Sequence, residues 1–335
     1  MNRPLLFVAG ALLLGIGLLA RAGAQAPLPQ HLRDTGWSPN VRSYAPQYPL
    51  WSDGADKRRW LVLPPGASID ASQPDAWVFP PGTKLWKEFS HEGRRVETRY
   101  IERGTDGRWR YATYVWNERG DDALLAPAEG ARASLVPEAP GGRYDIPAQA
   151  DCRACHEGTA VPVLGFSALQ LSSELRALVA QGVLRGLPAP MLEDPPRIAA
   201  TSPVERAALG YLHANCGHCH NDSAGAAPVR LRLAQSAVAD AATRDALRAT
   251  FMAATSRYRL PGAVGDTLIV APGRAGTSLI ALRMRSRAPR MQMPPLGTRV
   301  PDVEGIALIE RWIENLDPVS LSSISSSTAH PEHSP

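Results

Sequence analysis

The four cysteines of this chain constrain its chemistry and fold more than any other feature. They occur only as two pairs, Cys152/Cys155 and Cys216/Cys219, and a histidine follows each pair directly. This spacing places the two thiols of a pair about one helical turn apart, with the imidazole beside the second thiol. The second motif lies in the stretch LHANCGHCHN, which holds three histidines. Each motif can therefore present two thiols and one imidazole to a single bound group.

Three kinds of site use such thiol pairs: a zinc site, a redox dithiol and the covalent attachment of c-type haem. A four-cysteine zinc site would leave both following histidines unexplained. A thioredoxin-like dithiol uses one pair in a βαβ context, which this sequence lacks. Cys-x-x-Cys-His is the attachment motif of c-type haem, in which the thiols reach the porphyrin vinyl groups and the histidine reaches the iron. We therefore predict two covalently bound haem c groups. The expected attachment residues are Cys152 and Cys155 for the first haem, and Cys216 and Cys219 for the second. The expected axial ligands of the irons are His156 and His220.

The sixth position on each iron separates electron carriers from catalysts, because a Met thioether closes the site whereas an open position admits a small molecule. For the second haem we predict Met293, which lies in the proline-stiffened stretch RMQMPPLG, with Met291 as the second choice. An ordinary core methionine is the alternative interpretation. For the first haem Met191 is the candidate, His213 and His91 are weaker ones, and a vacant or water-ligated iron stays open.

The first 26 residues have the layout of a secretory signal peptide. Arg3 supplies a positive charge, an apolar run extends from Leu5 to Ala20, and the following AGAQA offers small-residue cleavage sites. A transmembrane anchor is the alternative, but the run is short, contains glycines and ends at Arg21. No later run of about 18 apolar residues occurs, so we expect a periplasmic protein with no membrane span in the mature chain.

Residues 27–148 have the pattern of a mainly antiparallel β domain. Seven of the eight tryptophans lie between Trp37 and Trp116. Aromatic and β-branched residues alternate with charged ones, and Asp106-Gly107 separates two such runs, which is typical of a hairpin. The strands expected are 59–63, 77–79, 96–100 and 109–116. The net charge of +4 includes Arg3 and Arg21, and the basic residues are scattered, so the sequence does not favour nucleic-acid binding.

The chain becomes rich in alanine and leucine after Cys152, which indicates helices. Helices are expected over 167–184, from 203 into Cys216, over 278–285 and over 302–316. The second of these has a strong start signal, because Ser202 is a good N-cap, Pro203 suits the first helical turn and Glu205 completes a capping box. The segment from 302 to 316 carries isoleucines and a leucine on one face, as an amphipathic helix does.

From Ser202 onward the chain resembles a class I cytochrome c domain. The matching pieces are the helix that leads into the second haem motif, the loop MPPLG that begins at Met293, and the closing helix over 302–316. The resemblance implies a helical fold around a haem with His220 and Met293 as axial ligands, and a role in electron transfer. The expected fold class is therefore multidomain α+β, with an N-terminal mainly antiparallel β domain followed by an all-α cytochrome c-type domain.

The whole layout also resembles a family of exported bacterial dihaem proteins. In that family a Trp-rich β domain with an FPPGT-like turn, here 79–83, and a YVWN strand, here 114–117, precedes the first haem motif. A fainter similarity connects the β domain to the lysine-crosslinked haem enzymes that oxidise hydroxylamine; Lys84 and Lys87 lie in this region, but no motif marks either one. The expected division is a signal peptide over 1–26, the β domain over 27–148, a first haem-binding segment and linker over 149–200, the cytochrome c domain over 201–318 and a disordered serine-rich tail over 319–335.

Two functions follow from these features. The first is a periplasmic dihaem electron carrier that exchanges electrons with redox protein partners, because the sequence contains positive evidence for carrier chemistry. The alternative is a haem-dependent oxidoreductase or peroxidase, in which the first haem is open on the β domain and the second relays electrons. A third hypothesis is that the β domain docks the cytochrome to a partner protein.

Overall fold

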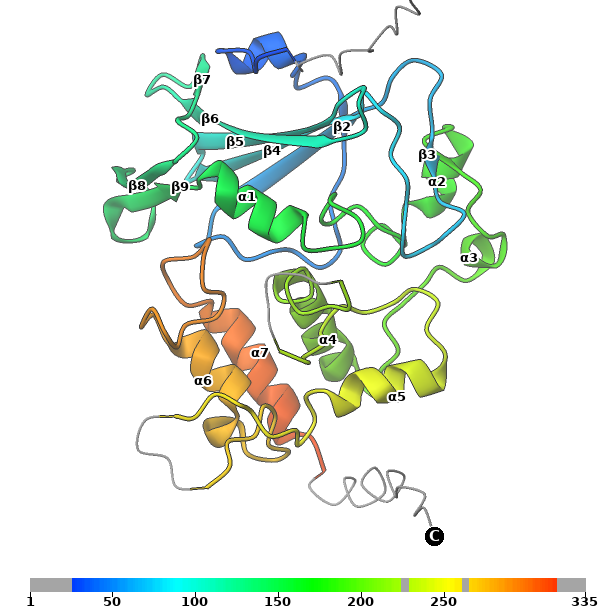
Figure 1. Cartoon of the computed structure of the whole chain (residues 1–335), viewed down its shortest axis with the longest axis vertical. Coiled ribbons are helices and arrows are strands. Elements are labelled where there is room, and N and C mark those ends of the chain that lie inside the picture. The colour runs from blue at the N-terminus through cyan, green and yellow to red at the C-terminus, as the bar shows by residue number, and fades with distance from the viewer. Residues whose placement is uncertain (1–25, 224–228, 261–264, 318–335) are drawn as a thin grey trace, which may run out of the picture.

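The computed structural model describes residues 26–223, 229–260 and 265–317. It has an α+β fold, with a β-sheet in the upper half of Figure 1 and a group of helices in the lower half. The sequence-based signal peptide and C-terminal tail lie outside the described residues, apart from Ala26. Within the part of the chain that the structure describes, no helix is long and apolar enough to cross a membrane.

The sheet has six strands in the order β1-β2-β4-β5-β6-β7, and every neighbouring pair is antiparallel. The strands are β1 (Arg42–Ser43), β2 (Asp56–Val62), β4 (Lys84–His91), β5 (Arg94–Arg103), β6 (Trp109–Trp116) and β7 (Ala123–Leu125). The predictions for 59–63, 96–100 and 109–116 are confirmed, and Gly107 makes the β5–β6 turn with a φ of 78°. The prediction for 77–79 is wrong: Val78 makes only an isolated bridge to Asp70, and prolines without N–H groups follow directly.

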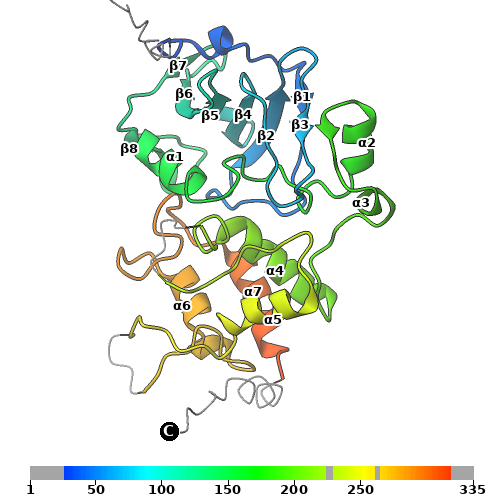
Figure 2. The same ribbon diagram turned by 45° about the vertical axis from the view of Figure 1, so that its right-hand side comes forward.

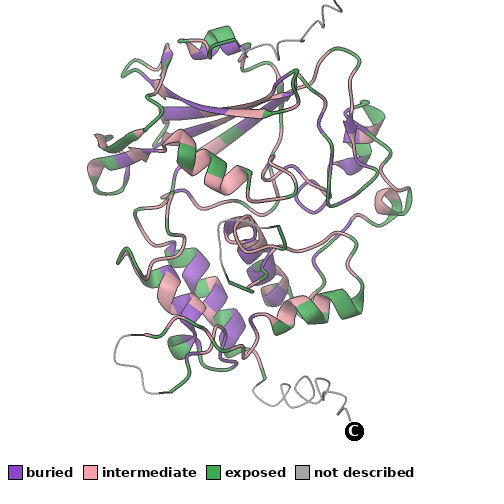
Figure 3. Ribbon diagram, viewed as in Figure 1, coloured by how far each residue is buried: buried purple, intermediate pink, exposed green. Residues whose placement is uncertain are grey.

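Side chains alternate between the two faces of this sheet, and each face has its own core. One face is aromatic, with Trp60, Trp86 and Tyr100 packed beneath the 3-10 helix η1 (Leu32–Thr35). The other face carries Leu61 and Leu85 and is covered by apolar residues of the segment 163–184. The sheet is therefore buried on both sides, as the purple strands in Figure 3 show.

The segment after the sheet completes this second core. It contains a hairpin of β8 (Ala131–Leu135) and β9 (Arg143–Ile146) joined by η2 (Pro140–Gly142), and the helices α1 (Gln149–His156), α2 (Leu175–Ala180) and α3 (Pro190–Glu193). Its short strand β10 (Leu184–Arg185) pairs in parallel with β3 (Ile69–Asp70), which lies between β2 and β4 in the chain. The helix predicted over 167–184 is wrong outside α2. The Gln170 carbonyl accepts the Gln47 N–H at 2.9 Å and its side-chain oxygen accepts the Tyr48 N–H at 3.0 Å, so tertiary hydrogen bonds replace helical ones here.

The C-terminal half is helical, with α4 (Pro203–Asn215), α5 (Ala241–Ala249), η3 (Ala275–Thr277), α6 (Leu279–Arg285) and α7 (Val303–Glu314). The predicted helices at 203, 278–285 and 302–316 are confirmed within two residues. Ser202 caps α4 by accepting the Glu205 N–H at 3.1 Å, whereas the Glu205 carboxylate binds the Thr201 N–H instead of completing the box at Ser202. Helix α5 was not predicted, because it lies on the surface and has no buried residue to give a periodic apolar signal.

The segment 47–53 joins the two halves, which Figure 2 shows one above the other. The Asn215 side chain, at the end of α4, accepts the Trp51 N–H at 2.7 Å and donates to the Pro49 carbonyl at 3.2 Å. The Asp53 carboxylate accepts the N–H groups of Arg299 and Val300 at 2.9 and 3.1 Å. These hydrogen bonds attach the segment before β2 to Asn215, which directly precedes Cys216, and to residues 299–300, which follow the Met293 loop.

Candidate functional site

The two Cys-x-x-Cys-His motifs lie side by side, although more than fifty residues separate them in the chain. The Cys155 thiol is within hydrogen-bonding reach of the Cys219 thiol and of the His218 ring. The Asn221 side chain, just after the second motif, donates to the Gly158 carbonyl, just after the first, at 3.0 Å. The sequence did not predict this contact. It makes the two motifs one continuous site.

The first motif occupies α1, which packs against β6. The Nδ1 atom of His156 lies 2.5 Å from the Pro162 carbonyl oxygen, and the ring lies 5.3 Å from that of Tyr111. A carbonyl oxygen only accepts, so Nδ1 carries the proton and Nε2 keeps its lone pair. Burial lowers the pKa of His156 to about 4, so the ring is neutral at neutral pH. An oriented, neutral imidazole with a free Nε2 is what an iron ligand requires.

The second motif forms the turn that ends α4. The N–H groups of Cys219 and His220 donate to the Cys216 carbonyl at 3.1 and 2.9 Å, which closes the turn. A Cβ atom on Gly217 would lie 2.6 Å from the His213 carbonyl and 2.9 Å from the Ala234 Cα atom, so only glycine allows this close approach. The segment at 233–234 is held here by the His220 carbonyl, which accepts the Leu233 N–H at 2.8 Å.

The His220 ring is placed differently from that of His156. Burial lowers the pKa of His220 to about 4, so it too is neutral at neutral pH. Its Nδ1 atom is buried without an aligned hydrogen-bond partner among the described residues, although the Leu231 backbone is near enough to raise the pKa. Within the part of the chain that the structure describes, His220 therefore lacks the aligned hydrogen bond that orients the His156 ring.

All four cysteines are free thiols. Burial raises the pKa of Cys152 to about 11 and that of Cys216 to about 12. These two thiols are protonated at neutral pH, whereas a reactive redox dithiol depends on a lowered pKa. The Cys219 thiol differs, because its interaction with the Cys155 thiol lowers its pKa. Within residues 26–223, 229–260 and 265–317, no group of three or more His, Cys, Asp or Glu side chains is placed to hold a metal ion. The described residues therefore do not form the four-cysteine zinc site that was the alternative interpretation.

Arg283, on α6, connects the Met293 loop to His220. The Met293 N–H donates to the Arg283 carbonyl at 3.0 Å, and the Arg283 Nε atom donates to the Met291 carbonyl at 2.9 Å. The guanidinium lies over the Tyr258 ring, 4.7 Å from its centroid, and its charge contributes to the lowered pKa of His220. The structure therefore brings the half-buried Met293 to the part of the molecule that carries His220.

The other candidates for the first haem are not brought to His156. Met191 lies in α3, which is well apart from α1 in both Figures 1 and 2, and no described contact joins it to His156. His91 is 5% exposed and packs edge-on against Tyr144, with ring centroids 5.6 Å apart. His213 accepts the Gln235 N–H on its Nδ1 atom at 3.0 Å, which is the environment of a structural histidine. The assignment of Met191 stays a prediction.

Sequence reasoning missed three residues that orient this site: Tyr111, Pro162 and Arg283. No fixed spacing relates them to the motifs, because Tyr111 comes from a strand, Pro162 from a turn and Arg283 from a helix of the other half. Only the run of aromatic and β-branched residues in β6 and the proline after the first motif were visible beforehand. Neither pattern identifies a partner across the fold.

His213 predicts a specific dependence of stability on pH. Burial lowers its pKa from 6.5 to about 4, so between these values the unfolded chain binds a proton that the folded chain does not. Its contribution to the free energy of unfolding is therefore complete above pH 6.5 and is lost as the pH falls toward 4. We expect the difference in melting temperature between the wild type and His213→Gln to shrink over this range. A difference that stays constant from pH 7 to pH 4 would contradict the prediction.

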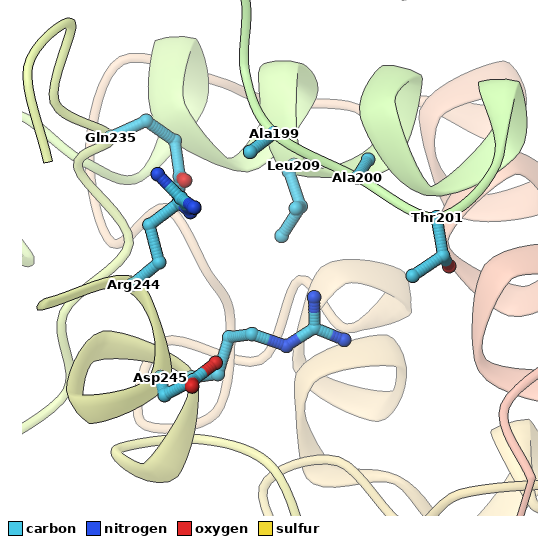
Figure 4. A pocket seen from close by; sticks show the side chains of 8 residues that line it. Ala199, Ala200, Thr201, Leu209, Gln235, Arg244 and Asp245 are labelled. Atoms are coloured by element: carbon cyan, nitrogen blue, oxygen red, sulfur yellow. The ribbon is translucent and has the colours of Figure 1, made fainter. Parts of the chain in front are cut away.

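A separate small pocket lies between α4 and α5, with a volume of about 170 Å³. Figure 4 shows its lining residues: Ala199, Ala200, Thr201, Leu209, Gln235, Arg244, Asp245 and Arg248. Of the two arginines that line it, Arg248 already forms an ion pair with Glu205 at 2.7 Å. The pocket is smaller than the roughly 300 Å³ at which ordinary ligand sites begin, and we assign it no function.

Comparison of the chain with protein-family models, with curated proteins and with solved structures finds no match.

Proposed function

We propose that this chain is a periplasmic dihaem c-type cytochrome that transfers electrons between redox protein partners. The observation that carries the proposal is the contact between the two attachment motifs, with the Cys155 thiol in reach of the Cys219 thiol. Two Cys-x-x-Cys-His motifs that fold against each other suit two redox groups at close range. Neither a zinc site nor a redox dithiol accounts for both histidines.

The residues of each motif have distinct roles in this proposal. The four cysteine thiols attach the two haem c groups, and the imidazoles of His156 and His220 bind the irons. The Pro162 carbonyl, 2.5 Å from His156, fixes the tautomer and the direction of that ring. Each haem, when bound, supplies an iron that cycles between the ferric and ferrous states. Burial of both imidazoles keeps them neutral and therefore available as ligands.

The helical half supports a finer assignment of fold, in which residues 201–318 form a cytochrome c-type domain. Its core packs α4 against α7 and α6 against α7 around buried residues that include Leu212, Ile309 and Trp312. Cys216 lies at the edge of this core. The helix before the motif and the helix after the Met293 loop therefore enclose the same region, as a cytochrome c-type fold requires.

A second candidate function is a haem oxidoreductase or peroxidase with an open first haem. The observation that favours it is that none of the sequence candidates Met191, His91 and His213 is placed against His156. We expect a mixed high-spin and low-spin spectrum that responds to cyanide, carbon monoxide or peroxide in this case. A wholly low-spin spectrum without such responses would leave the electron carrier as the function.

The main test is a spectrum of the protein purified after export, together with a pyridine haemochrome count. The proposal expects two covalent haems per chain, with absorption and paramagnetic-resonance signals of low-spin iron for the one at Cys216 and Cys219. A chain that carries no covalent haem would refute it. The periplasmic location is tested in the same preparation, because it requires the mature N-terminus to begin near residue 27.

Met293→Ala tests the axial ligand of the second haem. The weak near-infrared band of methionine-ligated ferric iron is expected to disappear, and the potential of this haem is expected to fall, because a thioether ligand raises it. Met291→Ala is the matched control, since Met291 lies in the same loop and is also half-buried. A band that survives Met293→Ala but disappears in Met291→Ala would move the assignment to Met291.

A further inference from the structure

Three cations stand in one row across the sheet, on Arg59 in β2, Lys87 in β4 and Arg99 in β5. The strand register pairs Arg59 with Lys87 and Lys87 with Arg99. Directly paired residues point to the same face with Cβ atoms about 5 Å apart, so the three side chains are immediate neighbours. We call these three residues the cationic row. Both Lys87 and Arg99 are near enough to His156 for their charges to contribute to its lowered pKa, so the row faces the first motif.

The cationic row is short of negative partners; Arg59 is buried, and Lys87 and Arg99 are half-buried. Arg59 is only 7% exposed, and its guanidinium makes no hydrogen bond or ion pair to any residue that the structure describes. The Lys87 ammonium lies 4.9 Å from the centre of the Phe89 ring but likewise makes no hydrogen bond to the described residues. Burial, followed by the charges of Arg59 and Arg99, holds the pKa of Lys87 well below its usual range. Arg59 and Lys87 are therefore adjacent cations, and neither forms an ion pair with the described residues.

The carboxylate beside the row does not neutralise it. Glu97 is fully buried, and its Oε1 atom accepts Arg99 Nε at 2.9 Å and the Tyr144 hydroxyl at 2.8 Å; its Oε2 atom has no hydrogen-bond partner. This carboxylate pairs with Arg99; its charge also acts on Lys87, but it forms no ion pair with Arg59 or Lys87. Lys57, two residues before Arg59, adds a further positive charge nearby, and its ammonium donates to the Leu50 carbonyl at 2.7 Å.

Unpaired hydroxyl groups lie on the same face. Thr113, on β6, is the next residue of the row, because the register pairs it with Arg99. Its hydroxyl and that of Tyr111 are both buried without a hydrogen-bond partner among the described residues. A hydroxyl group and a cationic side chain can both donate a hydrogen bond. The face therefore presents more donors than acceptors, which is an arrangement that a bound anion completes.

We propose that the cationic row is a binding site for a carboxylate or a similar oxyanion. Like charges on directly paired residues oppose sheet formation, and a buried cation that, like Arg59, has no ion-pair partner among the described residues is costly, so the folded sheet gains from an anion at this place. The arginine guanidinium offers a planar fork of N–H donors and the lysine ammonium a compact charge, and an oxyanion accepts hydrogen bonds from both. The site lies on the β-sheet, outside the two attachment motifs, and goes beyond the electron-transfer function.

Two sources could supply this oxyanion. One is a propionate of the first haem, and this source rests on the proposed function. The other is a free small anion that binds as a ligand or substrate beside the first motif, and this source stands on the sheet alone. The propionate and the free anion would bind the same donors, so the experiment includes a separate measurement for each source.

The test uses the full-length exported protein and the single variants Arg59→Gln and Lys87→Gln. Arg58→Gln is the matched control, because Arg58 lies on the same strand, points to the opposite face, is 57% exposed and pairs with Glu88. The melting temperature and the midpoint potential of each haem are measured against increasing acetate and, separately, inorganic phosphate, at constant ionic strength set with chloride. The haem count is measured for every variant.

A free anion is indicated if acetate or phosphate raises the melting temperature of the wild type and of Arg58→Gln, while Arg59→Gln and Lys87→Gln weaken the apparent affinity at least tenfold. A propionate is indicated if neither probe has an effect but both row variants lower the potential of one haem relative to Arg58→Gln. Arg59→Lys, which keeps the charge, should then retain most of the wild-type potential.

The proposal is overturned if both row variants behave like Arg58→Gln in potential and neither probe changes the melting temperature. It is equally overturned if Arg59→Gln and Lys87→Gln simply raise the melting temperature, because the two cations would then only destabilise the folded sheet and bind no anion. Should a row variant fail to fold, the anion dependence of the wild type and the behaviour of Arg59→Lys still decide. A wild type without haem refutes the proposed function but leaves the acetate and phosphate arm intact.

Discussion

Replacing both Cys216 and Cys219 with serine is expected to halve the haem content of the protein, from two groups per chain to one. The two thiols hold the second group covalently in our proposal, and serine cannot form the thioether. The motif also ends α4 and borders the helical core, so the helical half is expected to lose stability as well. The measurement is the mass of the intact protein together with the pyridine haemochrome count of the exported chain.

The matched control is the double variant Cys152→Ser/Cys155→Ser, which should also retain one haem but lose the group beside β6. The two double variants should therefore have complementary spectra, with the Met293-dependent near-infrared band present only in the control. His218→Ala should keep both haems, because His218 occupies the variable position inside the second motif. If Cys216→Ser/Cys219→Ser retained two covalent haems, the attachment assigned to this motif would be wrong.

Gly305→Val is expected to lower the free energy of unfolding by about 3 kcal/mol, the upper part of the usual range for overpacking. Gly305 lies on α7 where this helix meets Tyr211 of α4. A Cβ atom there would lie 2.4 Å from a Tyr211 ring carbon and 2.6 Å from an Asp302 carboxylate oxygen. The variant must either separate the helices or displace Asp302, whose carboxylate caps α7 by accepting the Gly305 N–H at 2.9 Å. Thermal and denaturant unfolding measure the loss.

Gly276→Val is the control for this substitution. Gly276 is exposed, and an added Cβ atom would meet nothing within 4 Å. Its melting temperature should stay close to that of the wild type. Equal losses in the two variants would show that the effect comes from glycine replacement in general and not from the α4–α7 contact. An unchanged Gly305→Val protein would show that the two helices are not in close contact.

The secondary structure was predictable where one face of an element is buried and the other is not. Alternation identified β5 and β6, and the Ser202 cap with its proline identified the start of α4, because these signals act between near neighbours in the chain. The same reasoning was wrong for 167–184. There the leucines are buried, but the Gln47 N–H donates to the Gln170 carbonyl that a helix would have used, and the Tyr48 N–H donates to the Gln170 side chain. Periodicity cannot reveal a competing partner so far away in the chain.

The sequence by itself determined the chemistry of the candidate site, because two thiols and an imidazole at fixed spacing are a local property of the chain. The tertiary structure decided which groups surround them. The contact of Cys155 with Cys219, the Pro162 carbonyl on His156 and the link from the Met293 loop through Arg283 all join distant segments. The cationic row depends on the register of three strands, and a shift of one residue would turn each side chain to the other face. Strand register and helix packing are set by the summed burial of many residues, so no single stretch of sequence contains them.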